Sequence, residues 1–315
     1  MNDRELLYIK TIAELHNISK ASEKLFVSQP SLSKCLSNVE NVIGTKLFKR
    51  TTEGLIPTLA GESYYKMACE ILKRYNDFQV EISDINSLQK GSITIGTTMY
   101  LGSCILPIVL PLFKKSCPNI EVNVLEMNST VLKKSLLSGM LDFAFMHTMY
   151  GENSSTDDSL SFYPLLREPF LLVTKKDHPL SRYGKYISHS PYKRMDLTIF
   201  SGEPFVLLNR KKKIGQISGN ILGLANISPP VVLTTDNYVT AKRLASVGIG
   251  STFLPQYYMK LFRDDYPSDC FSLDPKLKPY WVLGIGIKKG SYVSKASRIL
   301  IKIAEENVSL SDIKL

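Results

Sequence analysis

The sequence has little of what metal, redox and membrane proteins depend on. Its five cysteines are dispersed and form no CxxC pair, and its four histidines stand at no spacing typical of a metal site. No apolar run is long enough to span a bilayer. Acidic residues are the minority among the charged ones, 29 against 39 basic. We therefore expect reduced thiols, no metal or other cofactor, and an anionic partner for a net charge of +10.

Catalytic motifs are missing as well. There is no Gly-rich phosphate loop, GxSxG elbow, HExxH helix or paired-carboxylate motif. The four histidines are isolated, and His147, the one best placed for a cleft, has no identified base or nucleophile beside it. We do not expect an enzyme.

The N-terminus is charged over its first five residues and leads into an amphipathic run, unlike a signal peptide. This pattern predicts a soluble protein of the cytoplasm, without membrane contact. Its length of 315 residues allows two or three domains.

Two short runs with helical spacing open the chain. The first, residues 5–15, places Leu6, Ile9 and Ala13 on one face. Ser19 is a natural cap for the second, which buries Ala21 and Leu25.

A third helix is expected to open at Pro30, because proline is favoured where a helix amide has no partner. Its apolar stripe is Leu32, Leu36, Val39 and Ile43. The opposite face is small, polar and almost free of acid, and it consists of Ser31, Ser33, Lys34, Ser37, Asn38 and Asn41. Such side chains donate to base edges and phosphates in a major groove, although an ordinary polar surface is the alternative.

Residues 46–57 contain two strand-like runs around a Gly-containing turn, which predicts a hairpin carrying Lys49 and Arg50. Gln29 and Ser31 lie where the helix dipole and free amides attract phosphate. A helix-turn-helix followed by a basic hairpin is a DNA-binding arrangement.

A long helix is predicted from residue 59 to residue 89, with Thr58 as its cap. Apolar residues recur in it with a strict seven-residue repeat, at Tyr64, Ala68, Ile71, Tyr75, Phe78, Ile82 and Ile85. This repeat is typical of a coiled-coil seam, so a second copy of the chain is the expected partner. Packing within its own domain is the alternative.

Strands and helices alternate from residue 91 onward, which implies βαβ units and a parallel sheet. The expected strands are 92–96, 121–127 and 141–146, with helices at 105–115 and 130–137. A second part has strands at 162–166, 170–174 and 205–208, a helix at 238–246, and a closing strand and helix at 280–287 and 294–305.

Several ordered motifs resemble the LysR-type transcriptional regulators over essentially the whole chain. In the first 65 residues they are Ser28-Gln29-Pro30-Ser31-Leu32-Ser33-Lys34, Leu47-Phe48-Lys49-Arg50 and Pro57-Thr58-Leu59-Ala60-Gly61. Later ones are Gly91-Ser92-Ile93-Thr94-Ile95-Gly96, Leu141-Asp142, His178-Pro179-Leu180 and Gly248-Ile249-Gly250.

This resemblance implies an α/β multidomain protein. A winged helix-turn-helix would occupy residues 1–58, a linker and dimerisation helix 59–89, and a two-lobed effector domain like periplasmic binding proteins 90–315. Lobe one would comprise 90–165 and 268–315, and lobe two 166–267. The family assembles as a dimer or, usually, as a dimer of dimers (a homotetramer) on double-stranded operator DNA. A small-molecule effector between the lobes changes transcription.

The resemblance and the basic hairpin together suggest the residues that contact DNA, namely Ser19, Gln29, Pro30, Ser31, Ser33, Lys34, Lys49 and Arg50. The effector contacts implied by the family are Thr98, Met99, Tyr100, Ser129, Thr130, His147, Thr148, Leu208 and Asn209. Each of these could instead be a helix cap or a loop packing residue. Ser129 and Thr130 at the start of a helix would suit a carboxylate, and the hydroxyls and imidazole together favour a small polar or anionic ligand.

Alternative interpretations apply to two stretches of the chain and to its function. Residues 181–203 could form a lid, but a surface excursion is favoured, and the basic run 210–213 is interpreted as solvated rather than as an anion site. A cytoplasmic solute-binding protein of the same two-lobed fold is the alternative function, and it leaves the first 60 residues unexplained. Cys35, on the third helix, has no evident role.

Overall fold

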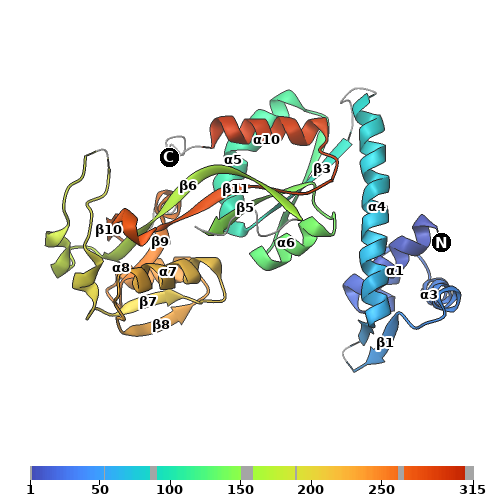
Figure 1. The fold of residues 1–315 in the computed structure, drawn as a ribbon, viewed down its shortest axis with the longest axis horizontal. Helices are drawn as coiled ribbons and strands as arrows, with labels where there is room; N and C mark the ends of the chain where they lie inside the picture. The colour runs from blue at the N-terminus through green and yellow to red at the C-terminus, as the bar shows by residue number, and fades with distance from the viewer. Residues whose placement is uncertain are drawn as a thin grey trace. The chain divides into compact units, whose positions relative to one another are not determined.

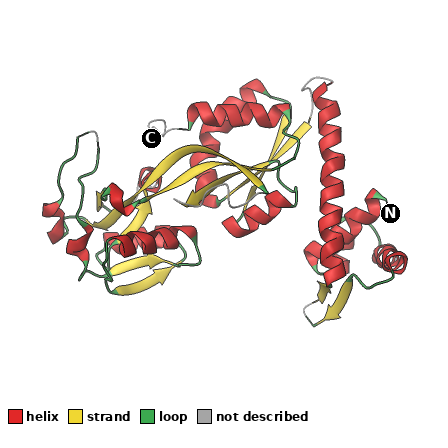
Figure 2. Ribbon diagram, viewed as in Figure 1, coloured by secondary structure: helices red, strands yellow, loops and turns green. Residues whose placement is uncertain are grey.

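The computed structural model describes residues 2–52, 54–85, 91–149, 159–188, 190–261 and 266–308 (Figure 1, Figure 2). The chain divides into two compact units. Unit 1 consists of Met1–Thr97, Lys114–Ala144 and Ile287–Ile299, and unit 2 of Thr98–Phe113, Phe145–Gly286 and Leu300–Leu315. The domain and lobe boundaries expected from the sequence stay predictions, and each unit is described by itself.

Unit 1 begins with three helices and a hairpin. The helices are α1 (Asp3–Leu15), α2 (Ile18–Lys24) and α3 (Gln29–Ile43), and the antiparallel strands are β1 (Phe48–Thr51) and β2 (Gly54–Pro57). These elements confirm the predicted helix-turn-helix and hairpin. Their shared core contains Leu6, Ile9, Ile12, Ala21, Leu32, Leu36 and Val39.

Three details of the prediction were wrong. The cap of α2 is Asn17, whose side chain accepts from the Lys20 N–H at 3.0 Å, and Ser19 lies inside the helix. Helix α3 begins at Gln29 rather than Pro30, because the Ser28 hydroxyl caps it one residue earlier. Ile43 is 44% exposed rather than part of the buried stripe, since it is the last residue before the left-handed C-cap Gly44.

Helix α4 (Leu59–Ile85) follows the hairpin directly, and the Thr58 hydroxyl accepts from the Gly61 N–H at 3.1 Å, as expected of its cap. Tyr64 and Ala68, the first two residues of the seven-residue repeat, are buried in the core of the three helices. The next four, Ile71, Tyr75, Phe78 and Ile82, are exposed. Packing within the domain therefore accounts for the start of the repeat only. The Ile85 side chain and residues 86–89 lie outside the described part.

The rest of unit 1 is a parallel sheet with helices, as predicted. Strand β3 (Gly91–Thr97) pairs in parallel with β4 (Ile120–Glu126) along its whole length. It also pairs in parallel with the start of β5 (Phe143–Met149), through Ile95 and Gly96. Helix α6 (Ser129–Leu137) buries Leu132 and Leu136.

Helix α5 (Met99–Ser116) starts six residues before the predicted helix at 105–115. Its two prolines, Pro107 and Pro111, lie inside the helix, where a proline is normally unfavourable. Most of the residues before Pro107 are buried, so tertiary packing outweighs this local cost.

In unit 2 the predicted strands 162–166 and 170–174 are one strand, β6 (Leu160–Lys175). The two charged residues between the predicted runs are accommodated in this strand, because the Arg167 guanidinium lies 5.3 Å from the ring centre of Tyr280 and Glu168 is fully buried with partners. Strand β6 pairs antiparallel with β9 (Thr252–Pro255) and β10 (Ser268–Phe271).

The remaining elements complete the two units. Strands β7 (Phe205–Leu208) and β8 (Val231–Thr235) pair in parallel, and β11 is Tyr280–Lys288. The helices are α7 (Lys213–Leu224), α8 (Tyr238–Ser246), α9 (Gln256–Leu261) and α10 (Lys295–Asn307), with short 3-10 helices at Pro179–Tyr183, Leu197–Phe200 and Pro275–Leu277. Strand β7 and helix α8 have their predicted bounds.

The stretch 181–203 is partly anchored in unit 2. Lys185 and Arg194 form an antiparallel bridge, and Met195, Leu197 and Phe200 are buried. Tyr186, by contrast, is exposed. The second half of this stretch is therefore a packed part of the unit rather than a surface excursion.

Among the described helices, none combines the length and apolar character needed to cross a membrane.

Candidate functional site

The predicted DNA-contact residues of α3 lie on its solvent side. Gln29, Pro30, Ser31 and Lys34 are exposed and Ser33 is half-buried. Ser28 caps the helix, and its first turn carries no acid. The positive end of the helix dipole is therefore available to an anion.

Ser19 joins the two helices of the motif. It is exposed on α2, and its hydroxyl donates to the Gln29 side-chain oxygen at 3.2 Å. The structure thus places the start of α2 beside the start of α3, and two of the predicted contact residues lie within hydrogen-bond distance of each other.

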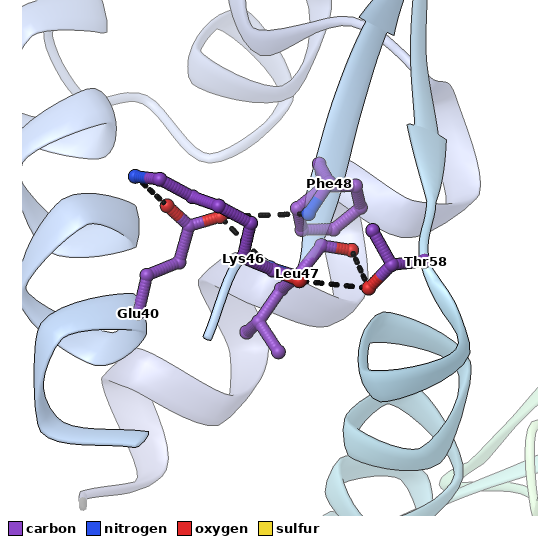
Figure 3. A network of polar contacts seen from close by, with 5 residues as sticks. All are labelled: Glu40, Lys46, Leu47, Phe48 and Thr58. Atoms are coloured by element: carbon purple, nitrogen blue, oxygen red, sulfur yellow. Dashed lines mark hydrogen bonds and ion pairs between the residues drawn. The ribbon is translucent and has the colours of Figure 1, made fainter. Parts of the chain in front are cut away.

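A buried carboxylate fixes the hairpin to α3 (Figure 3). Glu40 Oε1 accepts from the Leu47 N–H at 2.9 Å and from the Phe48 N–H at 3.4 Å, and Oε2 pairs with Lys46 Nζ at 2.6 Å. On the other side, the Thr58 hydroxyl donates to the Lys46 carbonyl at 2.8 Å. The end of α3, the start of β1 and the cap of α4 are therefore held together.

The hairpin is also attached to α1. The Leu55 N–H donates to the His16 carbonyl at 2.8 Å, and His16 Nδ1 lies 3.1 Å from the Leu55 carbonyl. Gly54 has φ +116°, and a Cβ there would lie 2.5 Å from the His16 carbonyl oxygen, so this position requires glycine. On β1, Lys49 and Arg50 are exposed and available to phosphate.

Two predicted effector residues meet at a buried carboxylate in unit 2. Glu168 is 0% exposed. The Tyr100 hydroxyl and the Tyr257 N–H donate to its Oε1, the Trp281 indole N–H donates to its Oε2, and His147 Nε2 lies 3.3 Å from Oε2. We call these five residues the Glu168 cluster. It joins β6 to α5, β5, α9 and β11.

Burial shifts the pKa of two members of the Glu168 cluster. Burial lowers the pKa of His147, and the Lys213 ammonium adds to this effect, while Glu168 opposes it. Burial, followed by the charge of Glu168, raises the pKa of the Tyr100 hydroxyl well above its usual value. His147 is therefore neutral at pH 7, stacked on Trp281 at a centroid distance of 3.6 Å.

The other predicted effector residues of unit 2 are more accessible. Met99 is exposed, and Thr98, Thr148 and Asn209 are half-buried, whereas Leu208 is buried. Some of them support the local backbone: the Thr98 hydroxyl accepts from the Leu101 N–H at 3.4 Å, and the Asn209 side chain accepts from the Lys211 N–H at 3.0 Å.

Lys213 links two of these segments, because its Nζ donates to the His147 carbonyl at 2.9 Å. It belongs to the basic run 210–213, as does Lys212, whose Nζ donates to the Asp236 carbonyl at 3.0 Å. Half of this run is thus engaged within unit 2, and Arg210 and Lys211 are exposed.

Ser129 and Thr130 belong to unit 1, in the first turn of α6. The cap of this helix is Asn128, which accepts from the Val131 N–H at 3.0 Å, so neither hydroxyl is needed as the cap. Ser129 is half-buried and Thr130 exposed.

Sequence reasoning missed Glu168, Trp281 and Lys213 as neighbours of the predicted effector residues. Glu168 is the one acidic residue among those of β6, and this was the available signal. The position of Trp281 gave no such signal, because its partners are far away in the sequence.

Three helices around one core, with an acid-poor polar helix beside a basic hairpin, define a winged helix-turn-helix DNA-binding domain. The family model described as the bacterial regulatory helix-turn-helix protein, lysR family, matches residues 4–62, and the LysR substrate binding domain matches residues 86–309. The chain therefore belongs to the LysR family of transcriptional regulators, with a DNA-binding and an effector-binding domain.

Known relatives agree with this assignment. The chain is 25% identical over 255 residues to the uncharacterized HTH-type transcriptional regulator YybE of Bacillus subtilis, covering 81% of this chain and 82% of YybE. A full-length cysteine-to-aspartate variant of OxyR from Pseudomonas aeruginosa has the same fold, with a TM-score of 0.73 and 18% identity over 97% of this chain and 94% of OxyR. Full-length CbnR, solved in complex with its target DNA, gives a TM-score of 0.63 and 17% identity, covering 96% and 100%.

Proposed function

We propose that this regulator binds operator DNA through α3 and the β1–β2 hairpin, and that a small molecule bound by the C-terminal domain changes this binding. The observation that carries the DNA-binding part is the exposed, acid-poor face of α3, held to a basic hairpin by the buried Glu40. CbnR, which has the same fold, was solved with its target DNA, and this supports the same class of ligand here.

Each contact residue has a chemical role in this proposal. Gln29, Ser33 and Lys34 offer donors to base edges in the major groove. Lys49 and Arg50 of the hairpin bind phosphates, which position the domain without reading sequence. The hydroxyls of Ser19 and Ser31 lie at or beside the α3 N-terminus and bind phosphate there, while Pro30 fixes the backbone of the first turn.

Pairing of two chains through α4 is part of the proposal. The exposed side chains of Ile71, Tyr75, Phe78 and Ile82 are spaced by four, three and four residues, so they lie on one face of the helix. Four such residues in water are unfavourable unless a second helix covers them. A dimer, or a dimer of dimers, would present two or more α3 helices to successive half-sites.

The effector is proposed to contact the accessible members of the predicted set, Thr98, Met99, Thr148 and Asn209, with Ser129 and Thr130 as further candidates. Tyr100 and His147 are assigned a supporting role, because their polar atoms already bind Glu168. Hydroxyl and amide side chains favour a small polar or anionic molecule.

Gel-shift titration at fixed salt tests the DNA-contact roles, with the DNA upstream of the protein's own coding sequence as the probe. Lys34→Ala and Arg50→Ala should each weaken binding about tenfold, the loss of about 1.4 kcal/mol of contact energy. Lys302→Ala is the control, since Lys302 is exposed on α10, outside the DNA-binding domain, and pairs with Glu306 at 3.8 Å. Equal affinity of all three variants and the wild type would refute the assigned roles.

A further inference from the structure

A surface groove of about 520 Å³ runs beside the proposed base-reading face of α3. The N-terminal turns of α1 form one of its walls, with Arg4 and Tyr8, and α3 forms the other. Ser31, Lys34, Cys35 and Asn38 line it from α3. The residues of the groove belong to one compact part of unit 1, because Tyr8 and Cys35 both pack against the shared core of the helices.

The charge of the groove favours an anion. Arg4 and Lys34, one on each wall, are exposed and positive. Glu5 also lines the groove, but its carboxylate accepts from the Asn2 N–H at 2.9 Å in the capping box of α1. With Arg4 and Lys34 against this one acid, the charged side chains that line the groove have a net charge of +1, which favours phosphate.

The position of the groove matches that of a DNA strand. A helix with its side chains is about 10–12 Å wide and fills a major groove about 12 Å wide, so the phosphates run directly alongside an inserted helix. The groove lies at the N-terminal end of α1, whereas the basic hairpin is attached at its C-terminal end, at His16. The 13 residues of α1 separate these two points by about 20 Å.

We propose that this groove receives the sugar–phosphate backbone beside α3 and that Arg4 is a phosphate ligand, which makes a second anchor opposite the hairpin. The inference rests on the proposed DNA binding and adds to it a contact surface outside the helix-turn-helix and the hairpin. DNA is the expected occupant for two reasons. The groove is continuous with the proposed base-reading face of α3, and each of its walls carries a basic side chain. Cys35 lines the α3 wall and is covered when the groove is filled.

Salt-dependent binding of the full-length protein to a mixed-sequence duplex of about 40 base pairs, roughly four helical turns, is the first test. Arg4→Ala should weaken binding about fivefold and lower the slope of log affinity against log salt by about 0.9 for each protomer's lost contact. Arg4→Lys should restore most of the slope, because a point charge suffices for phosphate.

Lys10→Ala is the matched control, since Lys10 lies on the same helix and its ammonium pairs with Glu14 at 3.6 Å. It should leave the slope unchanged. If Arg4→Ala behaves like Lys10→Ala while Lys34→Ala weakens binding, the groove contact is refuted and the proposed function stands. If the wild type binds neither this duplex nor its own upstream DNA, both fail.

Alkylation of the thiols by N-ethylmaleimide, followed by peptide mass spectrometry, tests occupancy of the groove without any substitution. Saturating duplex should slow the modification of Cys35 at least about fivefold, because thiol reactivity depends on access and the backbone covers this thiol. Cys270, partly buried in unit 2, is the internal control and should react at an unchanged rate. An unchanged Cys35 rate in the saturated complex would overturn the inference.

Discussion

Replacing Glu40 by alanine should free the hairpin from α3. The substitution removes the acceptor of two amides in buried residues, those of Leu47 and Phe48. An unsatisfied buried donor costs about 1–3 kcal/mol, and the Phe48 contact, at 3.4 Å, is the weaker of the two. The Lys46 side chain is 71% exposed, so its ion pair adds less than about 1 kcal/mol. We expect a total of about 3 kcal/mol.

Hydrogen exchange measured by mass spectrometry suits this prediction better than global unfolding, because the expected change is confined to one part of unit 1 and exchange reports each segment separately. Local opening of residues 46–58 should become about 100-fold more frequent in Glu40→Ala, the equivalent of about 3 kcal/mol. Exchange in helix α10 serves as the internal reference and should not change.

Two further variants separate the amide contacts from the ion pair. Glu40→Gln keeps an oxygen for the amides and should speed exchange only about fivefold, whereas Lys46→Ala should change it by less than that. If Lys46→Ala opens the hairpin as much as Glu40→Ala, the ion pair rather than the buried amides holds it, and the reasoning is wrong.

Two other properties should respond in defined ways. Phe78 is 59% exposed on α4, so Phe78→Glu should place charges in the proposed helix pair and give monomers in analytical ultracentrifugation. Lys66→Glu, on the same helix, should leave the assembly unchanged. If Phe78→Glu also leaves the assembly unchanged, the chains do not pair through α4. The pKa of His147 is lowered in the folded state, so the unfolded chain binds a proton first as the pH falls below about 6.5, and the free energy of unfolding should drop. Urea unfolding followed by the fluorescence of Trp281, the one tryptophan of the sequence, should show the free energy of unfolding falling between about pH 7.5 and 5.5. The fall should be smaller in His147→Gln, and an equal fall in both proteins would contradict the role of His147.

The spacing of apolar residues was sufficient to predict a helix or strand wherever residues close in the sequence bury one of its faces. The stripe of α3, the start of the helix α4 and the strands of the parallel sheet follow from residue spacing, and each of these elements is present close to its predicted bounds. The errors at Asn17 and Ile43 are end effects, because two cap-forming residues compete at the start of α2 and Ile43 is the last residue of α3, where the buried stripe ends.

The C-terminal domain was harder to predict because its burial depends on residues distant in the sequence. Two strands were predicted where β6 is one, because Tyr280 and Trp281, more than 100 positions later, supply the contacts of Arg167 and Glu168 in its middle. The same long-range contacts bury Tyr100 and His147, which the sequence could present only as candidate ligand contacts. The proposed DNA-contact face of α3, in contrast, depends only on spacing within one helix.

The Leu47 carbonyl connects the β1–β2 hairpin rigidly to helix α4. It accepts from both the N–H and the hydroxyl of Thr58, and a Cβ at Gly61 would lie only 2.0 Å from its oxygen, so the first turn of α4 sits directly against it. Rotation of α4 about its axis should therefore move the hairpin with it. It should also move α3, because Glu40 of α3 binds the Leu47 amide at the start of the hairpin. The direction in which the proposed DNA-contact face of α3 points should therefore change together with the rotation of α4 about its axis.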